Sequence, residues 1–268
     1  SRLFDKEFLA RLQRLALTSK YPTDTLSAGN RKSQSNGSSV EFTDYREYSH
    51  GDDYRRLDWN AYGRFEKLYI KLFTEEREAP VTVLLDVSRS MDWGEPNKSI
   101  SSRRLAAAIA YISLVNYDRV SLLCIDEGIQ KILTDIRGKN SFHRITDFLE
   151  DVRYGAGSSI QKAVEGCPVK WSRGITVLIS DLFTDGEFEE LLKYLAYRRQ
   201  TVHVCHILSP QETNPEVNEP VRLIDSETGR FVDITVTRGL LDSYHKTLNG
   251  FINGIERCCR KWGARYYQ

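Results

Sequence analysis

Three short segments of the chain carry the oxygen donors that a hard metal ion requires. The segment Asp86-Val87-Ser88-Arg89-Ser90 closes an apolar run, and Ser180-Asp181 closes another. Between them lies a glycine-rich segment, Tyr154-Gly155-Ala156-Gly157-Ser158-Ser159-Ile160. Because ligands of open α/β sheets bind at the carboxyl ends of the strands, we expect the three segments to meet at one edge of a sheet.

The chemistry of these donors favours a small divalent cation. Together the segments offer two carboxylates and several hydroxyls, with no sulfur or imidazole. Such a set suits Mg²⁺ or Mn²⁺, whereas Ca²⁺ is less favoured because so few carboxylates contribute. The D-x-S-x-S spacing alone is a weak signal, and Asp86 with its serines could simply cap the next helix. The motif nevertheless follows an apolar strand, and the other two donor segments come after it in the expected order along the chain. This context favours a metal site over a helix cap.

Other polar clusters favour structural roles. Three acidic residues lie among arginines, which predicts an ion-pair network rather than hydrolysis: Asp52, Asp53 and Asp58. Residues 94–99 resemble a phosphate-binding loop but have neither glycine of that motif at the right position. His203 and His206 point to opposite faces of their predicted strand, so no zinc site is expected.

The elements that must position the donors alternate between strands and helices. Apolar runs predict parallel strands at 81–87, 120–125, 175–180 and 201–208, an antiparallel edge strand at 129–133 and the start of a strand at 264–267. Helical patterns occur at 102–117 (with Ser101 or Ser102 as N-cap), 142–152, from Ile160, 187–197 and 240–262. Strands separated by helices, with right-handed crossovers, predict an α/β fold of the Rossmann type. Its sheet is doubly wound and mostly parallel, with helices on both faces.

We expect two parts in the chain. Residues 1–79 contain an amphipathic helix at 2–17, a mobile loop at 27–39 and an aromatic, charged block at 40–78, with a strand at 67–73. This extension is predicted to pack on a core domain at 80–268. A β-hairpin is predicted as an insertion at about 210–239, with strands at 221–224 and 231–236. The pattern breaks off within an element at Gln268, so the natural chain is expected to continue.

The donor segments resemble a known metal site. Asp86-x-Ser88-x-Ser90, then Gly157-Ser158, then Asp181 is similar to the metal-ion-dependent adhesion site of von Willebrand factor A-like domains. The resemblance implies that Asp86, Ser88, Ser90, Ser158 and Asp181 hold Mg²⁺ or Mn²⁺. The second loop of such sites usually supplies threonine; serine keeps the hydroxyl, and Ser159 is a rival for this position.

A second resemblance covers the chain from about Leu3 to its end. The pattern Phe42-x-x-Tyr45-Arg46-x-Tyr48-x-x-Gly51-Asp52-Asp53-x-Arg55-x-x-Asp58-Trp59 is followed by Arg64 and later by Ser90-Met91. It resembles a bacterial family of unknown function that sits beside MoxR-type AAA+ ATPases. The resemblance implies work with such an ATPase in the assembly or activation of other proteins.

Charge and cysteine content limit the partners and the compartment. The 38 basic and 37 acidic residues give a formal charge of +1, which predicts neither a nucleic-acid partner nor a membrane partner. The five cysteines cannot all pair, and Cys258 and Cys259 are adjacent in a helical pattern. Charged residues interrupt any N-terminal signal sequence. We therefore expect a cytoplasmic protein.

Two functions use the same site. In the first, the protein is a non-enzymatic binding module: its metal keeps one open position, which an acidic side chain of a partner fills. That partner would be a MoxR-type ATPase or its client. In the second, the ion activates water in a metal-dependent hydrolase, which needs a general base and usually more carboxylates. No histidine occurs in the three donor segments, which favours binding without catalysis.

Overall fold

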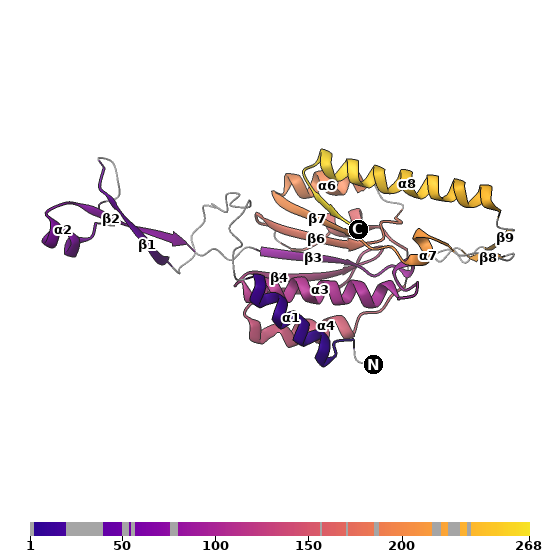
Figure 1. Ribbon diagram of the computed structural model, residues 1–268, viewed down its shortest axis with the longest axis horizontal. Helices are drawn as coiled ribbons and strands as arrows, with labels where there is room; N and C mark the ends of the chain where they lie inside the picture. The colour runs from indigo at the N-terminus through magenta and orange to yellow at the C-terminus, as the bar shows by residue number, and fades with distance from the viewer. Residues whose placement is uncertain are drawn as a thin grey trace. The chain divides into compact units, whose positions relative to one another are not determined.

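The computed structural model describes residues 3–19, 40–49, 54, 57–75, 80–155, 157–169, 171–184, 188–215, 221–224, 231–234 and 237–268. The chain divides into two compact units, Asp24–Glu78 and a larger one made of Ser1–Thr23 with Ala79–Gln268. The larger unit contains all three donor segments (Figure 1). The loop predicted at 27–39 lies outside the described residues.

The larger unit is built on a six-stranded sheet with the order β10-β7-β6-β3-β4-β5. Its strands are β3 (Pro80–Asp86), β4 (Arg119–Ile125), β5 (Ile129–Ile136), β6 (Gly174–Ser180), β7 (Gln200–His206) and β10 (Arg265–Tyr267). All neighbouring pairs are parallel except β4 and β5, which pair antiparallel at one edge. The prediction of a mostly parallel sheet with one antiparallel edge strand is confirmed.

The side chains of β3 explain why the sheet has a hydrophobic layer on each face. Val83 and Leu85 belong to one buried cluster, whereas Leu84 between them belongs to the other. This follows from the alternation of side chains along a strand. The edge strand β5 instead alternates between partly buried and exposed positions over most of its length, as a strand with one solvated face does.

Helices cover both faces of the sheet, as predicted. The helices of the larger unit are α1 (Lys6–Ser19), α3 (Lys98–Val115), α4 (Phe142–Glu150), α5 (Ile160–Glu165), α6 (Phe188–Tyr197), α7 (Pro210–Thr213) and α8 (Arg238–Lys261), with 3-10 turns η2 (Arg89–Met91) and η3 (Lys139–Ser141). Helices α1, α3 and α4 lie on one side, and α6 and α8 on the other (Figure 1). Leu12 of α1 and Ile145 of α4 join the cluster of Val83, while Leu191 of α6 and Ile255 of α8 join the opposite one.

Helix α3 begins earlier than the sequence predicted. Its N-cap is Asn97, whose side chain accepts a hydrogen bond of 2.8 Å from the backbone N–H of Ser99. The prediction of Ser101 or Ser102 as N-cap was therefore wrong. The early start places Lys98 in the first turn of the helix.

The smaller unit contains an antiparallel pair of strands, β1 (Val40–Glu47) and β2 (Tyr69–Glu75), and helix α2 (Trp59–Phe65). Asp58 caps α2 by accepting hydrogen bonds from the N–H groups of Asn60 and Ala61. In the larger unit, β8 (Val221–Ile224) pairs antiparallel with β9 (Phe231–Ile234). Whether this pair is an insertion, and whether the 40–78 block packs on the core, stay predictions.

Candidate functional site

Asp86 is the last residue of β3, and its side chain is fully buried. One carboxylate oxygen, Oδ1, accepts a hydrogen bond of 2.9 Å from the N–H of Ser88. The other, Oδ2, accepts one of 2.5 Å from the hydroxyl of Ser180 at the end of β6. The ends of the two central strands therefore meet at this carboxylate, as the sequence predicted.

The surroundings of Asp86 disfavour its ionised form. Burial, and after it the negative charge of Asp181, raise the pKa of Asp86 to about 6, although the hydrogen bonds from Ser180 and Ser88 oppose the rise. A cation placed beside Asp86 would favour its ionised form.

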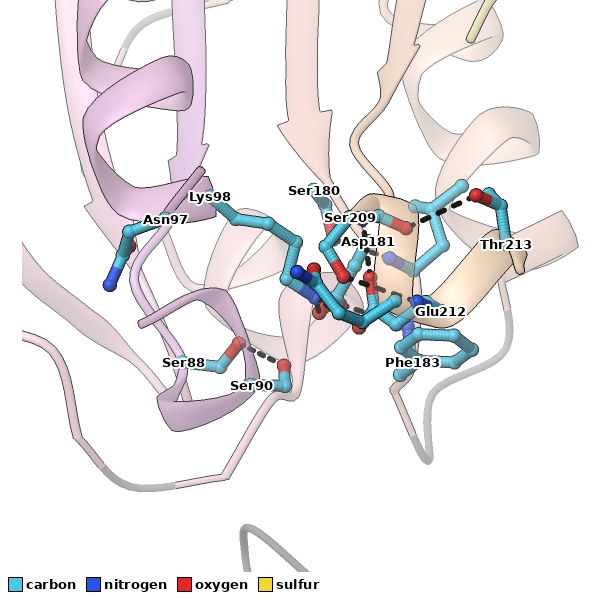
Figure 2. Close-up of polar contacts among 12 residues, drawn as sticks. Ser88, Ser90, Asn97, Lys98, Ser180, Asp181, Phe183, Ser209, Glu212 and Thr213 are labelled. Carbon is cyan, nitrogen blue, oxygen red and sulfur yellow. Dashed lines mark hydrogen bonds and ion pairs between the residues drawn. The ribbon is translucent and has the colours of Figure 1, made fainter. Parts of the chain in front are cut away.

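The two serines of the first segment lie together. Ser88 is fully buried and stands at the N-cap of η2, and its hydroxyl oxygen is 3.1 Å from that of Ser90 (Figure 2). Each hydroxyl keeps lone pairs beyond this hydrogen bond. The 3-10 turn and its N-cap therefore present two hydroxyl oxygens within four residues of Asp86.

Ser158 provides a buried hydroxyl that no described residue hydrogen-bonds. Its residue is 7% exposed, and its Oγ finds no hydrogen-bond partner among the residues that the structure describes. Its backbone carbonyl accepts a hydrogen bond from the hydroxyl of Thr184, three residues after Asp181, at 2.8 Å. In the same loop, the N–H of Gly155 donates to the carbonyl of Val87 at 3.2 Å. Hydrogen bonds thus connect the second segment to both of the others.

Asp181 is fully buried and already has a cationic partner. Its Oδ2 lies 2.8 Å from the ammonium nitrogen of Lys98, and its Oδ1 accepts a hydrogen bond of 3.2 Å from the N–H of Phe183. Leu182, the next residue, has a φ of 60°, a left-handed conformation that is strained for a branched side chain. The backbone after β6 is therefore held in an unusual turn at the predicted site.

Sequence reasoning missed the ion pairs around Asp181. Lys98 also bonds Oε1 of Glu212 in α7 at 2.6 Å, so its ammonium lies between two carboxylates (Figure 2). The phenyl ring of Phe183 lies 5.8 Å from the same ammonium. Two local signals were present in the sequence, although neither identifies the partner of Lys98. A lysine in the first turn of a helix opposes the helix dipole, and Ser209-x-x-Glu212 is a capping box after a parallel strand.

His206 was also missed as a neighbour of Asp181. It ends β7, where its Nε2 lies 2.9 Å from the carbonyl oxygen of Asp181 and its Nδ1 lies 2.8 Å from the hydroxyl of Tyr266. Burial lowers the pKa of His206. Both ring nitrogens are therefore occupied by structural hydrogen bonds.

The described part of the chain contains no group of three or more His, Cys, Asp and Glu side chains arranged to hold a metal ion. The predicted donors are of a different composition, with hydroxyls in the majority. The ammonium of Lys98 is paired with Asp181 and Glu212, and the charge of Asp181 acts in turn on a third carboxylate, Asp86. When all are ionised, these four side chains carry two negative charges in excess, which equals the charge that one divalent cation neutralises.

The family described as "Protein of unknown function DUF58" matches residues 44–249, and the chain belongs to this family. Among curated proteins it is similar to uncharacterized protein Rv1480 of Mycobacterium tuberculosis, with 24% identity covering 97% of this chain and 84% of the relative. An uncharacterized protein of Mycobacterium bovis, Mb1516, matches to the same extent. The family membership is established, and these two relatives are themselves uncharacterized.

Solved structures show weaker likenesses. BatB from Bacteroides thetaiotaomicron has a TM-score of 0.40 and 16% identity over 69% of this chain and 98% of its own. An aerotolerance-related membrane protein from Bacteroides fragilis has a TM-score of 0.40 and 14% identity over 71% of this chain and 90% of its own. The VWA domain of SpRpn10 has a TM-score of 0.36 and 14% identity over 48% of this chain and 75% of its own. Likenesses at this level carry no functional argument.

The prediction of a cytoplasmic location is contradicted by the names of two of the similar proteins. The Bacteroides fragilis protein is named a membrane protein, and a further match, from Vibrio fischeri, is named a membrane spanning protein. The absence of a signal sequence and the odd cysteine count were too indirect to establish a compartment. In the described residues, no helix has both the length and the apolar character needed to cross a bilayer.

Proposed function

We propose that this protein is a non-enzymatic, metal-dependent protein-binding module whose site lies at the carboxyl ends of β3 and β6. The observation that carries the proposal is the buried hydroxyl of Ser158, which has no hydrogen-bond partner among the described residues. Its loop is bonded to Val87, after Asp86, and to Thr184, after Asp181. Leaving a polar group buried and unpaired costs roughly 1–3 kcal/mol, so the hydroxyl is expected to have a ligand in the working protein.

The donors fit a small hard cation. Asp86 supplies the anionic oxygen, and Ser88, Ser90 and Ser158 supply neutral hydroxyl oxygens. Asp181, bonded to Lys98, contributes a second negative charge beside the ion. This set suits Mg²⁺ or Mn²⁺ better than Ca²⁺, and Ser158 suits it better than the partly exposed Ser159. When bound, the ion supplies a positive charge that attracts a carboxylate of the partner.

For the alternative, a metal-dependent hydrolase, the part of the chain that the structure describes offers no free histidine beside Asp181. His206 is near Asp181, but hydrogen bonds to Tyr266 and to the carbonyl of Asp181 engage both of its nitrogens. A general base must be within reach of the attacking water and able to take its proton. A binding role without catalysis therefore agrees better with the arrangement.

For the partner, we propose a protein that presents an acidic side chain, namely a MoxR-type AAA+ ATPase or the client of that ATPase. The support is the resemblance of the motif between Phe42 and Trp59 to a family found beside such ATPases. On this proposal the protein is an adaptor that brings the ATPase to the proteins it assembles or activates.

The test is a binding measurement on the full chain. Calorimetry with MgCl₂ or MnCl₂ should show binding to the wild type and none to Asp86→Ala, while the ATPase from the same cell should be captured with Mg²⁺ and released by EDTA. Asp151→Ala is a matched control because Asp151 is a surface carboxylate paired with Lys131. Capture that persists in EDTA and in Asp86→Ala would show that the contact surface lies elsewhere.

A further inference from the structure

We infer that Lys98 is a positioning residue that keeps the carboxylates of Asp181 and Glu212 away from the metal. It thereby keeps the site selective for a small ion that needs few protein carboxylates. The inference rests on the proposed function, because it concerns which side chains of the same site a metal can use. It starts from the ion pairs of Lys98, which the resemblance to metal-dependent adhesion sites did not include.

Lys98 is among the most deeply buried side chains of the described chain. It is 1% exposed, while Asp181 is fully buried and the side chain of Glu212 is 14% exposed. An ammonium group is buried in this way only when carboxylates compensate its charge. Lys98 therefore depends on both carboxylates, and both carboxylates are committed to it.

The segments that carry these charges are fastened to one another. Gln211, beside Glu212, exchanges two hydrogen bonds with the backbone of Glu95, of 3.1 and 2.9 Å. Gly94 approaches Ser209 so closely that a Cβ at position 94 would lie 2.6 Å from that of Ser209. Glu212 itself is fixed through its second oxygen, Oε2, which accepts a hydrogen bond of 2.6 Å from the N–H of Ser209. The loop that precedes Lys98 and the helix that carries Glu212 are therefore fixed to each other.

The ion pairs determine how many anionic oxygens remain for a metal. With Lys98 in place, Asp86 is the carboxylate of this cluster that is not paired with a cation. Without the ammonium, the carboxylates of Asp181 and Glu212 would both be left without their cation. Ca²⁺ takes six to eight oxygen ligands and gains most from added carboxylates, whereas Mg²⁺ retains several waters and uses one or two. Loss of Lys98 should therefore favour Ca²⁺ more than Mg²⁺.

The experiment compares ion selectivity in three full-chain variants. Calorimetry with CaCl₂ and with MgCl₂ is applied to Lys98→Met, to Lys98→Met combined with Glu212→Gln, and to Lys261→Met. The double variant is included because it leaves fewer buried carboxylates unpaired in the metal-free protein. Lys261→Met is the matched control, since it removes the same charge from an exposed ion pair with Glu189.

We expect both Lys98 variants to bind Ca²⁺ at least tenfold more tightly than the wild type, with a smaller gain for Mg²⁺ and no change in the control. Thermal melting should show that Ca²⁺ restores whatever stability the substitution removes. A purely structural lysine would lower the affinity for both ions together.

The outcomes separate this inference from the proposed function. If the folded double variant binds Ca²⁺ and Mg²⁺ each with the affinity of the wild type, the inference is overturned and the proposed function stands. Ion binding by the Lys98 variants alone contradicts both, because the wild-type site then selects no ion and Lys98 takes the place of the metal. If no protein binds either ion, both are wrong.

Discussion

The hydroxyl of Ser180 donates a hydrogen bond of 2.5 Å to the carboxylate of Asp86, and both side chains are fully buried. The two residues end neighbouring strands and are 94 positions apart in the sequence. Hydrogen bonds to an ionised acceptor are among the stronger ones in proteins. This contact fixes the orientation of the Asp86 carboxylate.

Stability should fall as the pH rises through the pKa of Asp86 in metal-free buffer. Its folded-state pKa of about 6 lies above the value of 3.8 expected when unfolded, so the folded protein binds the proton more tightly. The resulting stability is fully present below pH 4 and is lost by about pH 6. Linkage makes the loss about 3 kcal/mol at most. Urea unfolding of the wild type and Asp86→Asn should differ by this amount at pH 7 and agree at pH 4. Equal pH profiles would contradict it.

Mg²⁺ should offset the stability that the folded protein loses when Asp86 is ionised. A ligand that binds the folded state alone stabilises it by about 2.7 kcal/mol at a hundred times its Kd. The melting temperature of the wild type should therefore rise with MgCl₂ and return to its starting value with EDTA. Asp86→Ala should show neither change. A wild-type melting curve that does not respond to Mg²⁺ or Mn²⁺ would count against the metal.

Removing the hydroxyl of Ser158 should leave stability unchanged or raise it, but should weaken the binding of Mg²⁺. Ser158→Ala removes an unpaired buried group, so the metal-free protein should be unchanged or more stable by about 1 kcal/mol. The same change should weaken Mg²⁺ binding at least tenfold, which is about 1.4 kcal/mol.

Two further variants serve as controls for Ser158→Ala. Ser158→Thr should keep the affinity because it keeps the hydroxyl, and Ser159→Ala should have little effect on it. If Ser159→Ala weakens Mg²⁺ binding and Ser158→Ala does not, the ligand of the second loop is Ser159. Titration calorimetry and chemical unfolding measure the two quantities separately.

Gly94→Ala should destabilise the fold by roughly 1–3 kcal/mol. Gly94 has a φ of 95°, and its new methyl group would lie 2.6 Å from the Cβ of Ser209. Gly128→Ala is the comparison, because nothing lies within 4 Å of a Cβ at that position. Equal unfolding curves for the two variants would show that the loop before α3 can move away from α7.

The strand ends of the site could be predicted from the sequence because each depends on local signals. The apolar runs that become β3 and β6 are bounded by the polar residues Asp86 and Asp181, and parallel pairing brings such ends together. The loop around Ser158 could be assigned to the same edge for the same reason. The unpaired state of its hydroxyl could not, since that depends on what surrounds it.

The ion pairs of Lys98 could not be predicted because they are tertiary. Lys98 lies 83 residues before Asp181 and 114 before Glu212, and no local pattern pairs them. The start of α3 was misplaced for a related reason. Its first turn is polar and carries a lysine against the helix dipole, so propensity favoured a later start, whereas burial of the ammonium in the folded protein favours the observed one.

The same separations have a consequence for the order in which the molecule folds. We expect Lys98, Asp181 and Glu212 to meet after β6 has joined β3 and β7 has joined β6, because each pairing closes a long loop of chain. The three charges therefore come together late, after most of the sheet has formed. Interactions made after the transition state act on the rate of unfolding and leave the rate of folding almost unchanged. The buried lysine is thus expected to determine how long the native protein survives, with little influence on how fast it forms.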